Sequence, residues 1–217
     1  MSINKIKIAI FDFDGVICDS VSVKTNAFLE LYKDLDQKKL EIVKTYHLDN
    51  GGISRYEKIK YFEKLFFNKT ISEEKLKSMA NYFSNLVVQK VVESKFLPGV
   101  INFIKTCKKN DILTFICTGT PHTEILDITK KQGISILFDG IYGSPLSKQA
   151  IIKKIIKKYK ILNSECIFFG DAMTDYNAAN DTGILFYGIK NSDTEFPANT
   201  KLIPHFKNFL ININEFH

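Results

Sequence analysis

The sequence predicts an α/β protein built around a parallel β-sheet, and three observations lead to this fold class. Short continuous apolar runs, typical of buried parallel strands, recur at residues 6–11, 112–117, 166–169 and 184–187. Stretches with apolar residues at helical spacing lie between these runs. The chain has 217 residues, 45% of them hydrophobic, so it can bury a substantial core.

The first apolar run ends at two carboxylates, Asp12 and Asp14. Residues i and i+2 of an extended chain project to the same side, so both side chains can reach one cation or one reacting group. Gly15 then allows the chain to turn away sharply. The same short motif occurs in ordinary turns and in calcium loops, so the pair alone leaves a structural and a catalytic interpretation open.

Residues 20–94 carry apolar residues at helical spacing and contain no convincing strand. We therefore expect a helical domain of residues 20–94, inserted after the first strand of a core formed by residues 1–19 and 95–217. Hinges are expected near Ser20 and Ser94, where the chain crosses between the two parts.

Further elements follow in the core. Pro98 precedes a helix predicted over residues 100–109, and residues 201–203 could form a last short strand. In residues 151–160, isoleucines and lysines alternate at helical spacing, which predicts a helix with one apolar and one cationic face. A solvated helix face explains these lysines better than nucleic-acid or membrane binding does, although the net charge is +6.

The four cysteines are widely separated and form no Cys-x-x-Cys motif, so we expect reduced thiols. No apolar segment is long enough for a signal-peptide core or a membrane span. These features predict a cytoplasmic protein with no nucleic-acid, membrane or obligate protein partner.

A second carboxylate pair, Asp171 and Asp175, follows the apolar run 166–169 directly. Gly170 lets the strand turn, and a helix beginning near Ala172 would bring Asp175 back beside Asp171 after about one turn. An aspartate helix cap with an acidic first turn would explain the pair equally well in isolation.

Thr118 and Gly119 follow the predicted strand 112–117 and precede Pro121, which can open a helix. A hydroxyl, backbone N–H groups and a helix N-terminus make a phosphate cradle, although an ordinary threonine cap is the alternative. Lys148 stands before the lysine-rich helix, where its ammonium could reach a crevice. Ligands of open parallel sheets bind outside the carboxyl ends of the strands, so these strand ends can meet at one site.

Taken in this order, the four pieces resemble the four motifs of the haloacid dehalogenase superfamily, in its phosphatase branch. The helical insertion is similar to the type C1 cap of that superfamily, and the chain looks most like its phosphoglycolate phosphatase-like and β-phosphoglucomutase-like members. The resemblance implies a Rossmann-like sheet of strand order 5-4-1-2-3, flanked by helices, with a mobile cap. The residues that carry it are Asp12 with Asp14, Thr118, Lys148, and Asp171 with Asp175.

The resemblance also implies roles for the carboxylates. Asp12 would be the nucleophile that forms an aspartyl-phosphate, and Asp14 would protonate the leaving oxygen and later deprotonate the hydrolytic water. Mg²⁺ would be held by the Asp12 carboxylate, the Asp14 backbone carbonyl and Asp171, with Asp175 in or near the next layer of contacts.

Thr118, the N–H of Gly119 and Lys148 would bind the remaining phosphoryl oxygens, as the resemblance implies. Dehalogenases lack the second aspartate, so Asp14 favours phosphoryl transfer. The predicted protein is a Mg²⁺-dependent phosphatase acting on a small phosphorylated metabolite. A phosphomutase of the β-phosphoglucomutase type and a catalytically inactive binding or regulatory homologue remain alternatives.

Arg55 is the single arginine among 30 basic residues and follows a Gly-Gly turn in the helical insertion. Its planar guanidinium can hold carboxylates and phosphates by paired hydrogen bonds, which an ammonium cannot. We hypothesise that Arg55 contacts a distal anionic group of the substrate or a carboxylate of the core, with Lys58 as a second substrate-binding candidate. The alternative is an exposed arginine at a helix start. His47 and His122 could donate to a substrate, although a lone histidine is more often structural.

Overall fold

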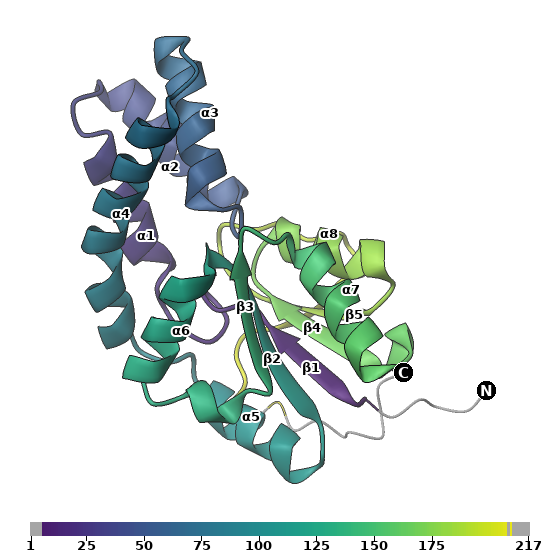
Figure 1. The fold of residues 1–217 in the computed structure, drawn as a ribbon. Helices are drawn as coiled ribbons and strands as arrows, with labels where there is room; N and C mark the ends of the chain where they lie inside the picture. The colour runs from purple at the N-terminus through teal and green to yellow at the C-terminus, as the bar shows by residue number, and fades with distance from the viewer. Residues whose placement is uncertain (1–5, 208, 210–217) are drawn as a thin grey trace.

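The protein, described by a computed structural model for residues 6–207 and 209, contains a six-stranded parallel sheet flanked by helices (Figure 1). The strand order is β3-β2-β1-β4-β5-β6, and every neighbouring pair is parallel. This confirms the predicted α/β fold and the order 5-4-1-2-3, to which β6 adds an edge strand. The strands are β1 (Ile8–Phe11), β2 (Leu113–Pro121), β3 (Gly140–Ser144), β4 (Cys166–Gly170), β5 (Leu185–Ile189) and β6 (Lys201–Ile203).

Two strands differ from the expectation. β3 was not located in the sequence, because its glycines Gly140 and Gly143 leave Ile141 and Tyr142 as an apolar run of only two residues. The prediction that β2 ends before Thr118 is wrong, because the strand continues to Pro121 while its pairing with β3 shifts register.

The side chains of the sheet alternate between two helical layers, as the period of two in a strand requires. Ala9 and Phe11 face the layer that contains α5 (Val100–Lys109) and α6 (His122–Lys131). Ile8 and Ile10 face the other layer, which contains α7 (Lys148–Tyr159) and α8 (Met173–Thr182). Figure 1 shows these helix pairs on opposite sides of the strands.

α7 confirms the predicted amphipathic pattern. Ile151, Ile152 and Ile155 are buried against the sheet, and the lysines at 153, 154, 157 and 158 are exposed. No helix among residues 6–207 is long and apolar enough to cross a membrane.

Between β1 and α5 the chain forms four helices with an aromatic core of their own, and we call residues 21–93 the helical segment. Phe28 packs against Phe62 and Phe83 at its centre. In Figure 1 the segment rises beyond the ends of the strands, so that it overhangs the edge where functional side chains were expected. Its helices are α1 (Val21–Leu31), α2 (Gln37–Asp49), α3 (Arg55–Phe67) and α4 (Glu73–Glu93).

Candidate active site

Three carboxylates gather at the carboxyl ends of β1 and β4. The two strands are hydrogen-bonded neighbours, with Phe11 beside Phe169, so Asp12 and Asp171 emerge close together. Asp175 lies in the first turn of α8, and one oxygen from each carboxylate lies within 4.8 Å of the others. Oxygen donors converging in this way suit Mg²⁺, which prefers carboxylate ligands.

Two glycines allow the carboxylates to approach one another. At Gly170 a Cβ atom would lie 2.2 Å from the Cβ of Asp175, and at Gly15 it would lie 2.0 Å from Oδ2 of Asp171. Gly15 also has a φ of +77°, a conformation that other residues rarely adopt. Glycine is therefore required at both strand-to-loop turns of the site.

Lys148 is the counter-charge of this cluster. Its Nζ lies 2.7 Å from Oδ2 of Asp12 and 2.5 Å from Oδ1 of Asp175. Burial alone would lower the pKa of Lys148, but the two carboxylates outweigh burial and hold the pKa above its usual value. The ammonium therefore stays charged, although it begins a helix whose other lysines face solvent.

One ammonium does not balance three carboxylates. Burial, followed by the charges of Asp12 and Asp175, raises the pKa of Asp171 well above its ordinary value. Burial also raises the pKa of Asp175 to about 7. A buried cluster with this excess of negative charge fits a divalent cation, so the residues present are compatible with the predicted Mg²⁺.

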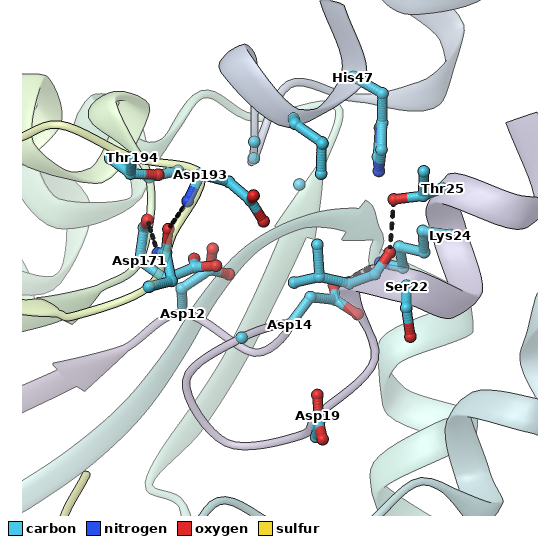
Figure 2. Close-up of a pocket in the computed structure, with 18 of the residues that line it drawn as sticks. Asp12, Asp14, Asp19, Ser22, Lys24, Thr25, His47, Asp171, Asp193 and Thr194 are labelled. Carbon is cyan, nitrogen blue, oxygen red and sulfur yellow. Dashed lines mark hydrogen bonds and ion pairs between the residues drawn. The ribbon is translucent and has the colours of Figure 1, made fainter. Parts of the chain in front are cut away.

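Asp14 occupies a different environment from Asp12. Its carboxylate forms an ion pair with Lys24 of α1 and accepts hydrogen bonds from Ser20 Oγ at 2.6 Å and Thr120 Oγ1 at 3.2 Å. Figure 2 shows Asp14 turned toward Lys24, whereas Asp12 lies beside Asp171. Burial pushes the pKa of Asp14 upward, but Lys24 and these hydrogen bonds outweigh it and leave the pKa below its ordinary value.

Lys24 and Thr120 were missed in the sequence. Lys24 is one of many lysines, and no local pattern distinguishes it. Thr120 had a usable signal, because residues 118 and 120 of an extended strand project to the same side. Thr118 is itself buried, and its Oγ1 accepts a hydrogen bond from the Thr120 N–H at 3.2 Å.

A cavity of about 800 Å³ lies between the strand ends and the helical segment. Its size is in the range of small-molecule sites. Lys148 lies in the wall of a smaller neighbouring cavity and reaches the site through Asp12. The sheet side of the large cavity includes Asp12, Asp14, Thr118, Gly119 and Asp171, and the helical segment contributes Lys24, Thr25, His47, Arg55 and Lys58.

The helical segment touches the phosphate-cradle region directly. The carbonyl oxygen of Gly52 lies so close to Gly119 that a Cβ there would be 2.2 Å away. Thr174 Oγ1 donates a hydrogen bond to the carbonyl of Gly51 at 2.5 Å. The Gly51–Gly52 turn thus packs on the core beside Lys148.

Arg55 is buried, so it is not an exposed residue at a helix start. Its guanidinium pairs through both terminal nitrogens with Glu124 of α6, with Nη1 at 2.9 Å from Oε2. Ser84 of α4 accepts from Nη1 at 2.5 Å and donates to Glu124 at 2.7 Å. Of the two partners hypothesised for Arg55, the structure contains the carboxylate of the core.

Lys58 lies one turn further along α3 and is also buried. Its Nζ is 2.8 Å from Nδ1 of His47 and donates to the His47 carbonyl at 3.1 Å. Burial, with smaller contributions from Lys24 and Lys148, lowers the pKa of Lys58 to about 7. The structure therefore brings Lys58 and His47 together on the wall of the cavity.

The family profile of the haloacid dehalogenase-like hydrolases matches residues 6–183. The chain therefore belongs to the haloacid dehalogenase-like hydrolases, which confirms the resemblance and makes the protein an enzyme of that family. A search of curated protein sequences finds no match.

Solved structures with the same fold include known and predicted phosphoryl-transfer enzymes. The β-phosphoglucomutase of Clostridium difficile is 24% identical, with a TM-score of 0.77, and the match covers 95% of this chain and 94% of that one. A predicted phosphoglycolate phosphatase of Haemophilus somnus is 18% identical, with a TM-score of 0.74 and coverage of 95% and 97%. CbbY of Rhodobacter sphaeroides, determined with phosphate, is 17% identical, with a TM-score of 0.73 and coverage of 94% and 96%.

Proposed function

We propose that the protein is a Mg²⁺-dependent phosphatase that hydrolyses a small phosphorylated metabolite through an aspartyl-phosphate on Asp12. The observation that carries this proposal is the separation of Asp12 and Asp14 into two environments. Asp12 lies in the carboxylate cluster against Lys148, while Asp14 is held by Lys24 and two hydroxyl groups. A nucleophile and a separate acid–base group need such a division.

In the first step, a carboxylate oxygen of Asp12 attacks phosphorus while the bond from phosphorus to the ester oxygen breaks. Asp14, which its low pKa leaves ionised beforehand, takes up a proton from solvent before this step and passes that proton to the departing oxygen. In the second step, Asp14 accepts a proton from water, whose oxygen attacks phosphorus and releases phosphate from Asp12. Lys24, Ser20 and Thr120 hold Asp14 in place for both transfers.

The remaining phosphoryl oxygens would bind the Thr118 hydroxyl, the Gly119 N–H and the Lys148 ammonium. Asp12, Asp171 and the backbone carbonyl of Asp14 would hold Mg²⁺, with Asp175 beside them. When bound, the ion would supply the positive charge that lets an anionic carboxylate approach an anionic phosphate.

Residues 20–94 would act as a cap over a core of residues 1–19 and 95–217, of which 1–5, 208 and 210–217 lie outside the described residues. The contact of Gly51 and Gly52 with the core supports this division, because it encloses the cavity beside the phosphate cradle. Substrate specificity would then reside in the cap side of the cavity, to which Arg55 and Lys58 belong.

The ion pair of Arg55 counts against one form of the mutase alternative. In that form, Arg55 itself would hold the non-reacting phosphate of a bisphosphate intermediate. Glu124 already neutralises the guanidinium through a two-point ion pair. Arg55 could bind a substrate phosphate only in exchange for this buried partner, which is costly.

The proposal is tested with p-nitrophenyl phosphate and a panel of phosphorylated metabolites. We expect hydrolysis that requires Mg²⁺ and disappears in Asp12→Asn, while Asp34→Asn, which alters an exposed aspartate of the helical segment, keeps full activity. A mutant of CbbY of Rhodobacter sphaeroides has been crystallised with xylulose 1,5-bisphosphate, so bisphosphates belong in the panel. Sugar phosphates that isomerise without phosphate release would indicate a mutase. No turnover of any ester would instead indicate an inactive homologue.

A further inference from the structure

Lys58 is the buried cation of this site that has no anionic partner among the described residues. It makes no ion pair with any residue from 6 to 207, although its side chain is 1% exposed. The neighbouring cations differ in this respect. Lys24 pairs with Asp14, Arg55 with Glu124, and Lys148 with both Asp12 and Asp175.

The groups that contact Lys58 are neutral. Its nitrogen faces the ring and the carbonyl of His47 and lies 5.6 Å from the centre of the Phe28 ring. Burial, reinforced by Lys58 and Lys24, lowers the pKa of His47 well below its ordinary value, so the imidazole is uncharged. A buried ammonium held only by neutral acceptors is unfavourable, and an ammonium has three donors, of which these contacts use two.

Lys58 and His47 also lie where the far end of a substrate would be. Both residues line the cavity from the helical segment, opposite Asp12 and the phosphate cradle of Thr118 and Gly119. Figure 2 shows His47 above the cavity, on the other side from Asp12. A cavity of about 800 Å³ accommodates much more than a phosphoryl group.

We propose that Lys58 and His47 bind a second oxyanion of the substrate, a carboxylate or a second phosphate, at the end away from the phosphoryl group that is transferred. This inference rests on the proposed phosphatase function and narrows its substrates to phosphate esters that carry another negative group. The structure assigns this site to Lys58 because Arg55, the other cap candidate, is already neutralised by Glu124.

Protonation of Lys58 should make the binding of such an ester depend on pH. Lys58 has a pKa of about 7, and a bound oxyanion would raise it, so the ester would bind together with a proton above pH 7. The charged and titratable groups that face Lys58 are His47 on α2, Lys24 on α1, and Asp14, Lys148 and Asp171 across the cavity. Binding should therefore weaken as the pH rises above 7.

The test uses pairs of esters that differ by one anionic group: 3-phosphoglycerate with glycerol 3-phosphate, and fructose 1,6-bisphosphate with fructose 1-phosphate. The first pair probes a carboxylate and the second a phosphate. Calorimetric binding to the Asp12→Asn protein keeps the esters intact and requires no turnover. In at least one pair, we expect the ester with the extra anionic group to bind about tenfold tighter or more than its partner.

Lys58→Met in the same background should reduce that preference to about twofold or less, whereas Lys60→Met, an exposed residue of the same helix, should keep it. Proton uptake on binding at pH 8, measured in buffers of different ionisation enthalpy, should disappear with Lys58→Met. In the active enzyme Lys58→Met should raise KM more for the ester with the extra anionic group than for its partner, whereas Lys60→Met should leave both KM values unchanged.

The two proposals fail in different ways. Equal binding of both members of every pair, or a preference that survives Lys58→Met, would overturn the oxyanion site while p-nitrophenyl phosphate hydrolysis would still support a phosphatase. Absence of hydrolysis would overturn the phosphatase proposal, and the binding preference in the Asp12→Asn protein would still decide whether Lys58 holds an oxyanion.

Discussion

Replacing Lys58 with methionine should change how the stability of the protein depends on pH. The folded protein lowers the pKa of Lys58 from 10.5 to about 7, so between these values the unfolded chain binds more protons than the folded one. Stability contributed by such a group rises with pH through this window. The wild type should thus gain stability as the pH increases from 7 toward 10, and a chain with methionine at this position should lack that gain.

The size of the effect follows from the shift. At about 1.36 kcal/mol for each pKa unit, the change from 10.5 to about 7 makes the charged form unfavourable by about 5 kcal/mol well below pH 7. The same two pKa values predict that the penalty falls by about 2 kcal/mol between pH 6.5 and 8.5. Methionine removes this penalty but also removes the hydrogen bonds to His47. Their loss lowers the free energy of unfolding by about 1–3 kcal/mol, and it does not depend on pH in that range.

Urea unfolding of the wild type, Lys58→Met and Lys60→Met at pH 6.5 and 8.5 would measure the effect, with chelator present in all samples. Titratable groups that do not face Lys58 titrate equally in the three proteins and cancel in the differences. The free energy of unfolding of Lys58→Met minus that of the wild type should fall by about 2 kcal/mol from pH 6.5 to 8.5. The free energy of unfolding of Lys60→Met should follow that of the wild type. Parallel pH profiles for wild type and Lys58→Met would refute the reasoning.

Three further predictions concern the site and its contacts. Asp14→Asn should slow both formation and breakdown of the Asp12 intermediate by about 100- to 10,000-fold, measured by rapid quench with labelled ester; unchanged rates would remove Asp14 as the acid–base group. Gly52→Ala would place a Cβ 2.4 Å from Thr174 Oγ1 and should lower kcat/KM by about tenfold or more. The control is Gly133→Ala, which is also at positive φ but has open space around it and should leave kcat/KM unchanged. Glu124→Gln leaves a buried guanidinium without its counter-charge and should cost about 3–5 kcal/mol in urea unfolding; a cost below 1 kcal/mol would show that the pair is unimportant.

The parts of the site that were predictable are those determined by local sequence. Asp12 and Asp171 follow apolar runs directly, so their positions at neighbouring strand ends follow from strand periodicity and sheet topology. Asp175 follows from the helical repeat that begins after Gly170. The extension of β2 through Thr118 was not predictable in the same way, because polar residues and a glycine continue a strand only where a neighbouring strand pairs with them.

The contacts between the helical segment and the core were the least predictable part of the site. Lys24 meets Thr120 of β2, and Glu124 of α6 meets Arg55 of α3, across long stretches of chain, and no spacing in the sequence indicates these pairings. Arg55 was singled out by its rarity, but its ion pair with Glu124 depends on how α3 packs against α6. Long-range packing of this kind has no local signature.

The charges around the cavity explain why the two ends of the site need different ligands. Asp12, Asp171 and Asp175 face a single ammonium from Lys148, so the sheet side has an excess of carboxylates that a divalent cation would balance. On the side of the helical segment, every cavity-lining lysine or arginine but Lys58 is paired with a carboxylate among the described residues. A substrate with a phosphoryl group at one end and an oxyanion at the other would then meet positive charge at both ends. A neutral far end would leave the buried Lys58 without a counter-charge, which is the physical basis for discriminating against it.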